Sequence, residues 1–369
     1  MKMKMKMFIS GVLHLDLFNY LRISKCADIK HLQKTQNEET MSAIGKMKTT
    51  AIPIFFFCVI SFAFADLRVG FYDSRCPRAE SIVHQVVQRR FNRDRSIAAA
   101  LLRMHFHDCF VNGCDASILI DPKGNRTSEK NAGPNQTVRG YELIDEAKEI
   151  LEEECRLTVS CADIITLATR DAVALAGGIR YSVPTGRRDG FTSDPRLVNL
   201  PGPALSVSRA LEFFTAKGLT LEDMVTLMGG HTVGIAHCSV FQQRLSSFHG
   251  TLDPTMNPNL DTLLVQICGS PNKPSRSDAF AFLDQGSAFV FDNQFYNQLD
   301  LKGGVLHIDQ QLALDPMTRD MVTSFAADNR RFQESFANAM IKLASIGVFV
   351  GSDGEIRKNC RLFNNPHAL

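Results

Sequence analysis

The chain of 369 residues is long enough for one large domain or two smaller ones. Its composition is ordinary for a globular protein, with 44% apolar and 22% charged residues. The 41 basic and 39 acidic residues leave a net charge of +2, which gives no reason to expect a nucleic-acid or membrane-surface partner.

The N-terminal segment is predicted to lie outside the mature protein. A lysine precedes the apolar run 51–65, which ends in Ala-Phe-Ala. A basic start, a short apolar core and a final A-x-A are typical of a secretory signal peptide, which we expect over residues 47–65. Residues 1–46 are then a spurious or optional extension. Because the apolar run is short and contains Pro53, we do not expect it to span a membrane.

The cysteine content indicates disulfides. Ten cysteines are present, and two of them, Cys26 and Cys58, precede the predicted mature protein. An even number of remaining cysteines in an exported chain favours disulfide bonding, but eight cysteines allow 105 pairings, and their spacing does not select one. The absence of any C-x-x-C pair disfavours a metal site. The eight cysteines are Cys76, Cys109, Cys114, Cys155, Cys161, Cys238, Cys268 and Cys360.

Residues 66–369 are predicted to form one mostly helical domain with two lobes. Apolar side chains recur at helical spacing in 82–87 and in 332–340. Ser160 and Thr220 are each followed three residues later by Asp, which is typical of a helix N-cap. Alternation typical of strands is sparse. Stretches rich in Pro, Gly, Asn and Asp predict ordered loops at 121–135, 189–203 and 250–259.

The most informative segment is the Ala- and Leu-rich stretch 97–107, which is predicted to be helical. Arg103 and His107 are four residues apart and therefore share a helix face. An imidazole can carry a proton from one peroxide oxygen to the other, while a guanidinium stabilises charge on the leaving oxygen. Considered alone, the spacing also fits an ordinary surface Arg–His pair.

A cluster of oxygen-bearing side chains follows immediately. Asp108, Asp115 and Ser117 lie within ten positions, around a short loop between two cysteines that can bridge. Hard oxygen ligands gathered by a tight turn suit Ca²⁺. A solvated acidic loop is the alternative interpretation.

A second candidate imidazole ends the helix predicted after Thr220. His231 directly follows two glycines, which allow a bulky group to approach the backbone closely. An imidazole at a helix end is a common haem-iron ligand, although a surface or capping role is the ordinary alternative.

Together these segments resemble the secretory (class III) plant peroxidases. The segment 101–117 is similar to the distal haem helix of that family, and the resemblance runs from Asp66 to about Asn364. It implies an all-α, two-lobed haem peroxidase fold, with one haem b held between distal and proximal helices. It also implies oxidation of small phenolic or similar aromatic donors by hydrogen peroxide, two donor molecules giving one electron each.

The resemblance assigns roles around the haem. His107 is the expected acid–base catalyst and Arg103 the stabilising cation, and Phe106 is expected to shield the iron-bound oxygen. Asn135 and Glu129 match the hydrogen-bond chain that orients the distal imidazole.

On the other side of the haem, the resemblance makes His231 the axial iron ligand. Asp309 matches the buried carboxylate that accepts the N–H of the proximal imidazole, a bond that increases the anionic character of the ring. Pro201 is expected to offer its carbonyl to a phenolic donor at the haem edge.

Two Ca²⁺ sites follow from the same resemblance. In the second, Ser287 stands where the family usually has Thr, and Ala288 replaces the usual Pro. The first site is expected to use Asp108, Val111, Gly113, Asp115, Ser117 and, through water, Glu129. The second is expected to use Thr232, Asp284, Ser287, Val290 and Asp292.

The resemblance also selects one cysteine pairing, a place of action and an oligomeric state. We expect a monomer exported to the extracellular space or cell wall rather than the vacuole. Two other classes of function remain: a haem-bearing wall protein that acts by binding, and a disulfide-rich helical hydrolase without haem. The expected disulfides are Cys76–Cys155, Cys109–Cys114, Cys161–Cys360 and Cys238–Cys268.

Overall fold

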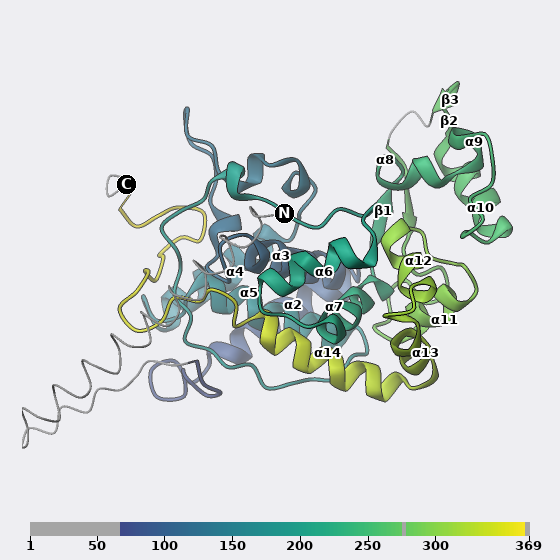
Figure 1. The fold of residues 1–369 in the computed structure, drawn as a ribbon. Coiled ribbons are helices and arrows are strands. Elements are labelled where there is room, and N and C mark those ends of the chain that lie inside the picture. Colours follow the sequence, from purple (N-terminus) through teal and green to yellow (C-terminus); the bar gives the residue numbers. More distant parts are fainter. Residues whose placement is uncertain (1–66, 275–277, 366–369) are drawn as a thin grey trace, which may run out of the picture. The chain divides into compact units, whose positions relative to one another are not determined.

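The computed structural model describes residues 67–274 and 278–365. The predicted signal peptide and extension, with Cys26 and Cys58, lie outside the described residues. Helices dominate the described part, which confirms the all-α prediction (Figure 1). None of the helices in these two ranges is long and apolar enough to cross a membrane.

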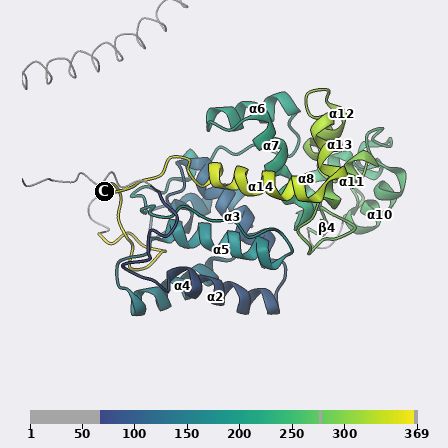
Figure 2. The same ribbon diagram turned by 90° about the horizontal axis from the view of Figure 1, so that it is seen from below.

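In the N-terminal half, three long helices pack around a fourth, α5 (Figure 2). Thirteen of the fifteen residues of α5 are buried, since the helix is covered by its neighbours on every side. Its N-terminus is capped by Ser160, whose hydroxyl accepts a hydrogen bond from the Asp163 amide, as the sequence predicts. The four helices are α2 (Ala79–Arg93), α3 (Ile97–Val111), α4 (Tyr141–Glu154) and α5 (Cys161–Leu175).

The C-terminal half contributes a second set of helices. The long helix α14 packs against α7 and α13, and it buries Phe332, Phe336 and Met340, the residues predicted to form its apolar face. Thr220 forms a capping box with Asp223 at the start of α7. The set comprises α6 (Val207–Ala216), α7 (Leu221–Met228), α8 (Cys238–Phe241), α9 (Ser246–His249), α10 (Pro258–Cys268), α11 (Gln294–Asp300), α12 (His307–Leu314), α13 (Arg319–Ala327) and α14 (Asn329–Leu343).

Strands are short in the described residues. β1 (Ile235–His237) pairs antiparallel with β4 (Phe280–Phe282), so that Ile235 lies opposite Phe282. β2 (Gly269–Ser270) pairs antiparallel with β3 (Lys273–Pro274). Neither ribbon has the side-chain alternation that would reveal a strand in the sequence.

Several turns of 3₁₀-helix matter for the site. Two of them, η3 (Glu129–Asn131) and η4 (Gly133–Asn135), lie in the loop 121–135. A third, η6 (Gly229–Thr232), continues directly from α7 and carries His231. Such short turns have weak sequence signals because each is stabilised by a few local hydrogen bonds.

Four disulfides connect the described residues, in the pairing that the resemblance implies. Two of them close long stretches of chain, 79 residues for Cys76–Cys155 and 199 residues for Cys161–Cys360. Cys238–Cys268 closes 30 residues, and Cys109–Cys114 closes only five. The last of these staples the end of α3, next to the oxygen-rich loop.

Candidate functional site

Arg103 and His107 lie on the same face of α3, as their spacing predicts. The Nε–H of Arg103 donates to Nε2 of His107 at 3.3 Å, and Nη2 of Arg103 donates to the Pro134 carbonyl at 2.8 Å. His107 is buried, whereas Arg103 keeps part of its surface. The guanidinium is therefore held against the imidazole by the loop that contains η4.

A hydrogen-bond chain determines which nitrogen of His107 carries the proton. Nδ1 of His107 lies 2.6 Å from Oδ1 of Asn135, and Nδ2 of Asn135 donates to the Glu129 carbonyl at 2.9 Å. Because the amide nitrogen is committed to Glu129, Oδ1 must accept, and Nδ1 of His107 must donate. Nε2 is then the basic nitrogen, and it faces Arg103.

The surroundings of His107 keep its imidazole neutral. Burial lowers its pKa most, the Arg103 charge lowers it further, and the bond to Asn135 opposes them, so that the pKa falls to about 4. A neutral imidazole with a free Nε2 can accept a proton at ordinary pH, and it can return that proton to a neighbouring oxygen.

Phe106 precedes the imidazole on α3 and is half-buried. Its ring lies 4.2 Å from that of Phe110 and 6.2 Å from that of Phe214 on α6, measured between centroids. These contacts anchor one side of the ring. Phe106 is thus a fixed apolar wall beside His107, with a centroid distance of 6.0 Å.

The second imidazole is oriented by a buried carboxylate. Nδ1 of His231 lies 2.9 Å from Oδ1 of Asp309 on α12, and the carboxylate is 1% exposed whereas 36% of the His231 side chain is exposed. Burial lowers the pKa of His231, but the charge and hydrogen bond of Asp309 outweigh it and raise the pKa. No other hydrogen bond to this ring is present among the described residues, so Nε2 is available to a metal ion.

Gly229 explains how η6 comes so close to the core. A Cβ at this position would lie 2.4 Å from both the Tyr296 hydroxyl and the Phe332 ring. The Tyr296 hydroxyl donates to the Val225 carbonyl on α7 at 2.9 Å. A side chain at residue 229 would therefore push the turn that carries His231 away from these aromatic rings.

The helix that carries His107 contacts the segment that carries His231. At Gly234, just after η6, a Cβ would lie 3.0 Å from the Cβ of Ala99 on α3. Gly234 also has a φ of +104°, a conformation that L side chains rarely adopt. The structure thus places in contact the segments that carry two histidines 124 residues apart in sequence, each with its own polar partner.

The oxygen cluster predicted after α3 is buried, and several of its side-chain oxygens lack a hydrogen-bond partner among the described residues. The hydroxyl of Ser117 and both carboxylate oxygens of Glu129 have no hydrogen-bond partner among the described residues. Burial, with a smaller contribution from Asp115, raises the pKa of Glu129 to about 8. Burial and the neighbouring carboxylates also raise the pKa of Asp108 and of Asp115. Orphaned buried oxygens and mutually repelling carboxylates are what a site for a hard cation requires.

Val111 and Gly113, whose carbonyls are expected in this first Ca²⁺ site, are both held in place by neighbouring groups. The Val111 carbonyl accepts a hydrogen bond from Lys217 Nζ at 2.8 Å, which leaves one of its lone pairs for another partner. Gly113 has a φ of +138°, and a Cβ there would lie 2.4 Å from the Gly347 carbonyl. The turn therefore requires glycine at this position.

The second oxygen cluster is assembled from two segments. The Thr232 hydroxyl lies 3.1 Å from Asp284 Oδ2 and 3.3 Å from Asp292 Oδ1. The Ser287 hydroxyl lies 3.2 Å and 3.0 Å from the same two oxygens. Four side-chain oxygens thus converge immediately after His231. Val290 belongs to the same loop, and its amide donates to the Ser287 carbonyl.

One predicted site residue remains apart from these clusters. Pro201 is half-buried in the loop after η5 (Pro195–Leu197). No described contact joins it to His107 or His231, so its substrate role stays a prediction.

A third cluster of metal-binding residue types has a structural explanation. His105, Cys109 and Cys114 lie close together in the core. The two sulfurs form a disulfide and cannot act as thiolates, while burial lowers the pKa of His105 to about 3. This cluster is part of the buried packing of α3.

The sequence interpretation missed two cations beside the first oxygen cluster. Lys217 reaches it from the end of α6, and Arg357 reaches it from the C-terminal segment. Neither lies in a motif, and their sequence separations of 106 and 241 residues from their partners leave no local signal.

Comparison with known proteins identifies relatives over most of the chain. A family model described as "Peroxidase" matches residues 83–328. The chain is 54% identical over 321 residues to Peroxidase 44 of Arabidopsis thaliana, which covers 86% of this chain and 100% of that protein. It is 52% identical over 319 residues to Peroxidase 57 of Arabidopsis thaliana, covering 86% and 98%. It is 42% identical over 315 residues to Peroxidase 5 of Vitis vinifera, covering 84% and 95%.

Proposed function

The chain belongs to the peroxidase family and is a haem enzyme that oxidises aromatic donors with hydrogen peroxide, and from that premise we propose how its residues divide the work. The residues that would hold one haem b are His231 on one side and the pair formed by Arg103 and His107 on the other. When bound, the haem supplies the iron that receives the oxidising equivalents of peroxide. The remaining steps belong to side chains.

His231 would hold the iron through Nε2, and Asp309 would increase the electron density of that imidazole. The carboxylate accepts the Nδ1 proton and fixes the ring orientation, which makes the imidazole a more electron-rich ligand. The unbonded Nε2 and the exposed ring face support this assignment.

His107 moves the proton of peroxide. Its basic Nε2 takes a proton from one oxygen and returns it to the other, which departs as water. Arg103, held by the Pro134 carbonyl, stabilises the charge that develops on the departing oxygen. Asn135 keeps the proton on Nδ1 and so keeps Nε2 basic. The single observation that carries this proposal is the chain Arg103–His107–Asn135–Glu129.

Phe106 and Pro201 are the residues that would determine where the aromatic donor binds. Phe106 is a fixed apolar wall that keeps donors from the reacting oxygen, and Pro201 offers its carbonyl to a phenolic hydroxyl at the haem edge. The half-buried state of both residues is compatible with these roles.

Two Ca²⁺ ions complete the proposal, one in each oxygen cluster. The first is bound by Asp108, Asp115, Ser117 and the Val111 and Gly113 carbonyls, with Glu129 acting through water. The second is bound by Thr232, Asp284, Ser287, Asp292 and the Val290 carbonyl. We further propose that residues 47–65 are removed as a signal peptide and that residues 66–369 act as a monomer, exported to the cell wall or extracellular space.

Replacement of His107 tests the central step. His107→Leu is expected to slow the reaction with peroxide by about 10²–10⁴-fold, since general acid–base catalysis contributes that much. Stopped-flow absorbance of the haem-loaded enzyme measures the rate, and His249→Leu, an exposed imidazole at the end of α9, is the control. A variant as fast as the wild type would refute the role of His107. A protein that takes up haem but turns over no guaiacol would favour a binding function.

A further inference from the structure

The C-terminal strap, residues 355–361, inserts a buried arginine beside the first oxygen cluster. The Arg357 side chain is 0% exposed. Its Nη1 donates to the Ala116 carbonyl at 2.7 Å, and its Nη2 donates to the Gly190 carbonyl at 2.6 Å. Both acceptors belong to segments that adjoin the proposed Ca²⁺ ligands.

The two carbonyls that Arg357 contacts are tied directly to the acidic side chains. The Ala116 amide donates to Asp108 Oδ2 at 3.0 Å, and the Gly190 amide donates to the Asp115 carbonyl at 2.8 Å. A Cβ at residue 190 would lie only 2.2 Å from Asp115 Oδ2, so the Gly190 backbone lies against that carboxylate. The Arg357 guanidinium is therefore separated from the acidic side chains only by the backbone of Ala116 on one side and by the backbone of Gly190 on the other.

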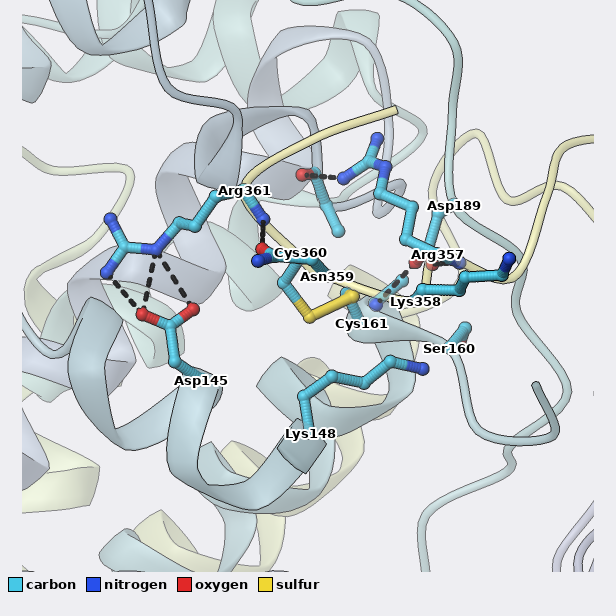
Figure 3. The surroundings of a disulfide bond; sticks show 12 residues. Asp145, Lys148, Ser160, Cys161, Asp189, Arg357, Lys358, Asn359, Cys360 and Arg361 are labelled. Carbon is cyan, nitrogen blue, oxygen red and sulfur yellow. Dashed lines mark hydrogen bonds and ion pairs between the residues drawn. A yellow bond between two sulfur atoms is a disulfide. The ribbon is translucent and has the colours of Figure 1, made fainter. Parts of the chain in front are cut away.

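A hydrogen bond and a disulfide hold the strap, and with it Arg357, in place. Asp189, which is fully buried, accepts from the Arg357 amide at 3.0 Å with one oxygen and from the Ala162 amide at 3.0 Å with the other. Cys360 is bonded to Cys161, the neighbour of Ala162. Figure 3 shows Arg357 and Arg361 extending to opposite sides of this disulfide. Arg361 reaches Asp145 on α4, with contacts of 2.7–2.9 Å.

Three carboxylates buried together are stabilised by a nearby positive charge from the protein. Asp108, Asp115 and Glu129 are 1%, 2% and 0% exposed. Arg357 lies against this cluster through the carbonyl of Ala116, the residue between Asp115 and Ser117, while its Nε lies 3.7 Å from Oε1 of Glu355 on the same strap. An uncompensated group of buried carboxylates would be strongly destabilising.

We propose that Arg357 is the built-in counter-ion of the Asp108–Asp115–Glu129 cluster. In this role Arg357 stabilises the loop after α3 when no Ca²⁺ is bound, and it weakens the binding of Ca²⁺. Arg357 is a positioning residue, since it contacts the backbone of that loop and not the reacting groups. The inference rests on the proposed Ca²⁺ site. Arg357 is expected to lower the affinity for Ca²⁺ because a guanidinium and a divalent cation near the same carboxylates repel each other.

The test compares Ca²⁺ binding and thermal unfolding in Arg357→Gln and Arg357→Lys. The haem-loaded enzyme is depleted with a chelator, titrated calorimetrically with Ca²⁺, and melted with and without Ca²⁺ while circular dichroism is followed. Arg357→Gln is expected to bind Ca²⁺ at the first site at least about tenfold more tightly. Its Ca²⁺-free form should lose more of its melting temperature than its Ca²⁺-loaded form. Arg357→Lys keeps the charge, so its affinity should stay within about threefold of the wild type.

Arg244→Gln is the matched control. Arg244 is also a buried arginine whose Nη1 donates to two carbonyls, those of Gly304 and Val305, at 2.6 and 2.8 Å. It pairs with Asp253 rather than with the acidic cluster. Its replacement should lower both melting temperatures equally and leave Ca²⁺ affinity unchanged.

The outcomes separate the two proposals. If Arg357→Gln behaves like Arg244→Gln, or binds Ca²⁺ more weakly, Arg357 is only a structural support and the counter-ion proposal is wrong. If Asp115→Asn leaves the Ca²⁺ titration unchanged, the proposed first Ca²⁺ site is wrong instead.

A double variant keeps the test decisive if Arg357→Gln does not fold. Asp115→Asn with Arg357→Gln removes one charge of each sign, so the counter-ion model predicts that the Ca²⁺-free double variant folds and is more stable than Arg357→Gln alone. A double variant at least as unstable as the two single changes combined would overturn the model.

Discussion

At the scale of single residues, the proton on His107 is positioned by groups that lie outside α3. Asn135 and Glu129 come from the loop 121–135, and together they leave Nε2 as the basic nitrogen. Burial and Arg103 lower the pKa of His107 to about 4, which is the value that should govern the acid limb of the reaction with peroxide. Above that pH the imidazole is neutral and can accept a proton. Below it, the rate should fall about tenfold per pH unit.

Asn135→Val tests this chain. The hydrogen bond that His107 donates to Asn135 raises the pKa of His107, so its loss should move the acid limb to lower pH. The maximal rate should fall by about 10–100-fold because the ring is no longer held in one tautomer. Stopped-flow rates between pH 3 and 8 are the measurement, and Asn125→Val, at an exposed loop position, serves as control. An unchanged acid limb would contradict the proposed chain.

Asp309→Asn tests the partner of the second imidazole. The carboxylate raises the pKa of His231 against the opposing effect of burial, so the neutral amide should lower that pKa and make the ring a weaker donor. We expect a rise in the reduction potential of the bound haem and a loss of about 10–100-fold in turnover. Spectroelectrochemistry and steady-state assays measure the two effects. Asp315→Asn, after the end of the same helix, should change neither.

At the scale of elements, helices were predictable where the pattern is local. The apolar faces of α2 and α14 and the caps of α5 and α7 follow from side chains three or four positions apart. α3 extends to Val111, four residues beyond the predicted segment. Its last turn is buried and is bonded to the following loop by the Cys109–Cys114 disulfide.

What the sequence could not supply is the set of contacts between distant segments. β1 and β4 are three residues each and pair across some 40 intervening residues, so neither has a recognisable period. The pair Arg103–His107 follows from helical spacing, but its link to Asn135 and the link of His231 to Asp309 came from family resemblance. Arg357 was missed because its contacts form only once the strap is folded against the loop after α3.

The turn η6 gives an element-scale prediction. Gly229→Ala would place a methyl group 2.4 Å from Tyr296 and Phe332, and overpacking of this kind costs about 1–3 kcal/mol. Gly230→Ala is the matched control, because its Cβ would meet nothing closer than 3.8 Å. Chemical denaturation of the haem-free proteins measures the difference. Equal stabilities would show that η6 does not depend on this close approach.

At the scale of the whole molecule, the disulfides should contribute unequally. In the chain-entropy model, the loop of 199 residues closed by Cys161–Cys360 is worth about 5 kcal/mol, and the five-residue loop closed by Cys109–Cys114 about 2 kcal/mol. The paired serine variants Cys161→Ser/Cys360→Ser and Cys109→Ser/Cys114→Ser allow the comparison by denaturant unfolding. A larger loss from the short loop would mean that its local role beside the acidic cluster outweighs chain entropy.

Asn135 also begins the triplet Asn-Gln-Thr, an acceptor sequence for N-linked sugar. Its side chain is 2% exposed, and its Nδ2, the atom that a glycan would occupy, donates to Glu129. A sugar attached there before folding would be too large for the interior and would remove the acceptor of His107. Glycosylation at this position and catalytic competence are thus mutually exclusive in any one molecule, and the active fraction of a preparation should carry no carbohydrate on Asn135.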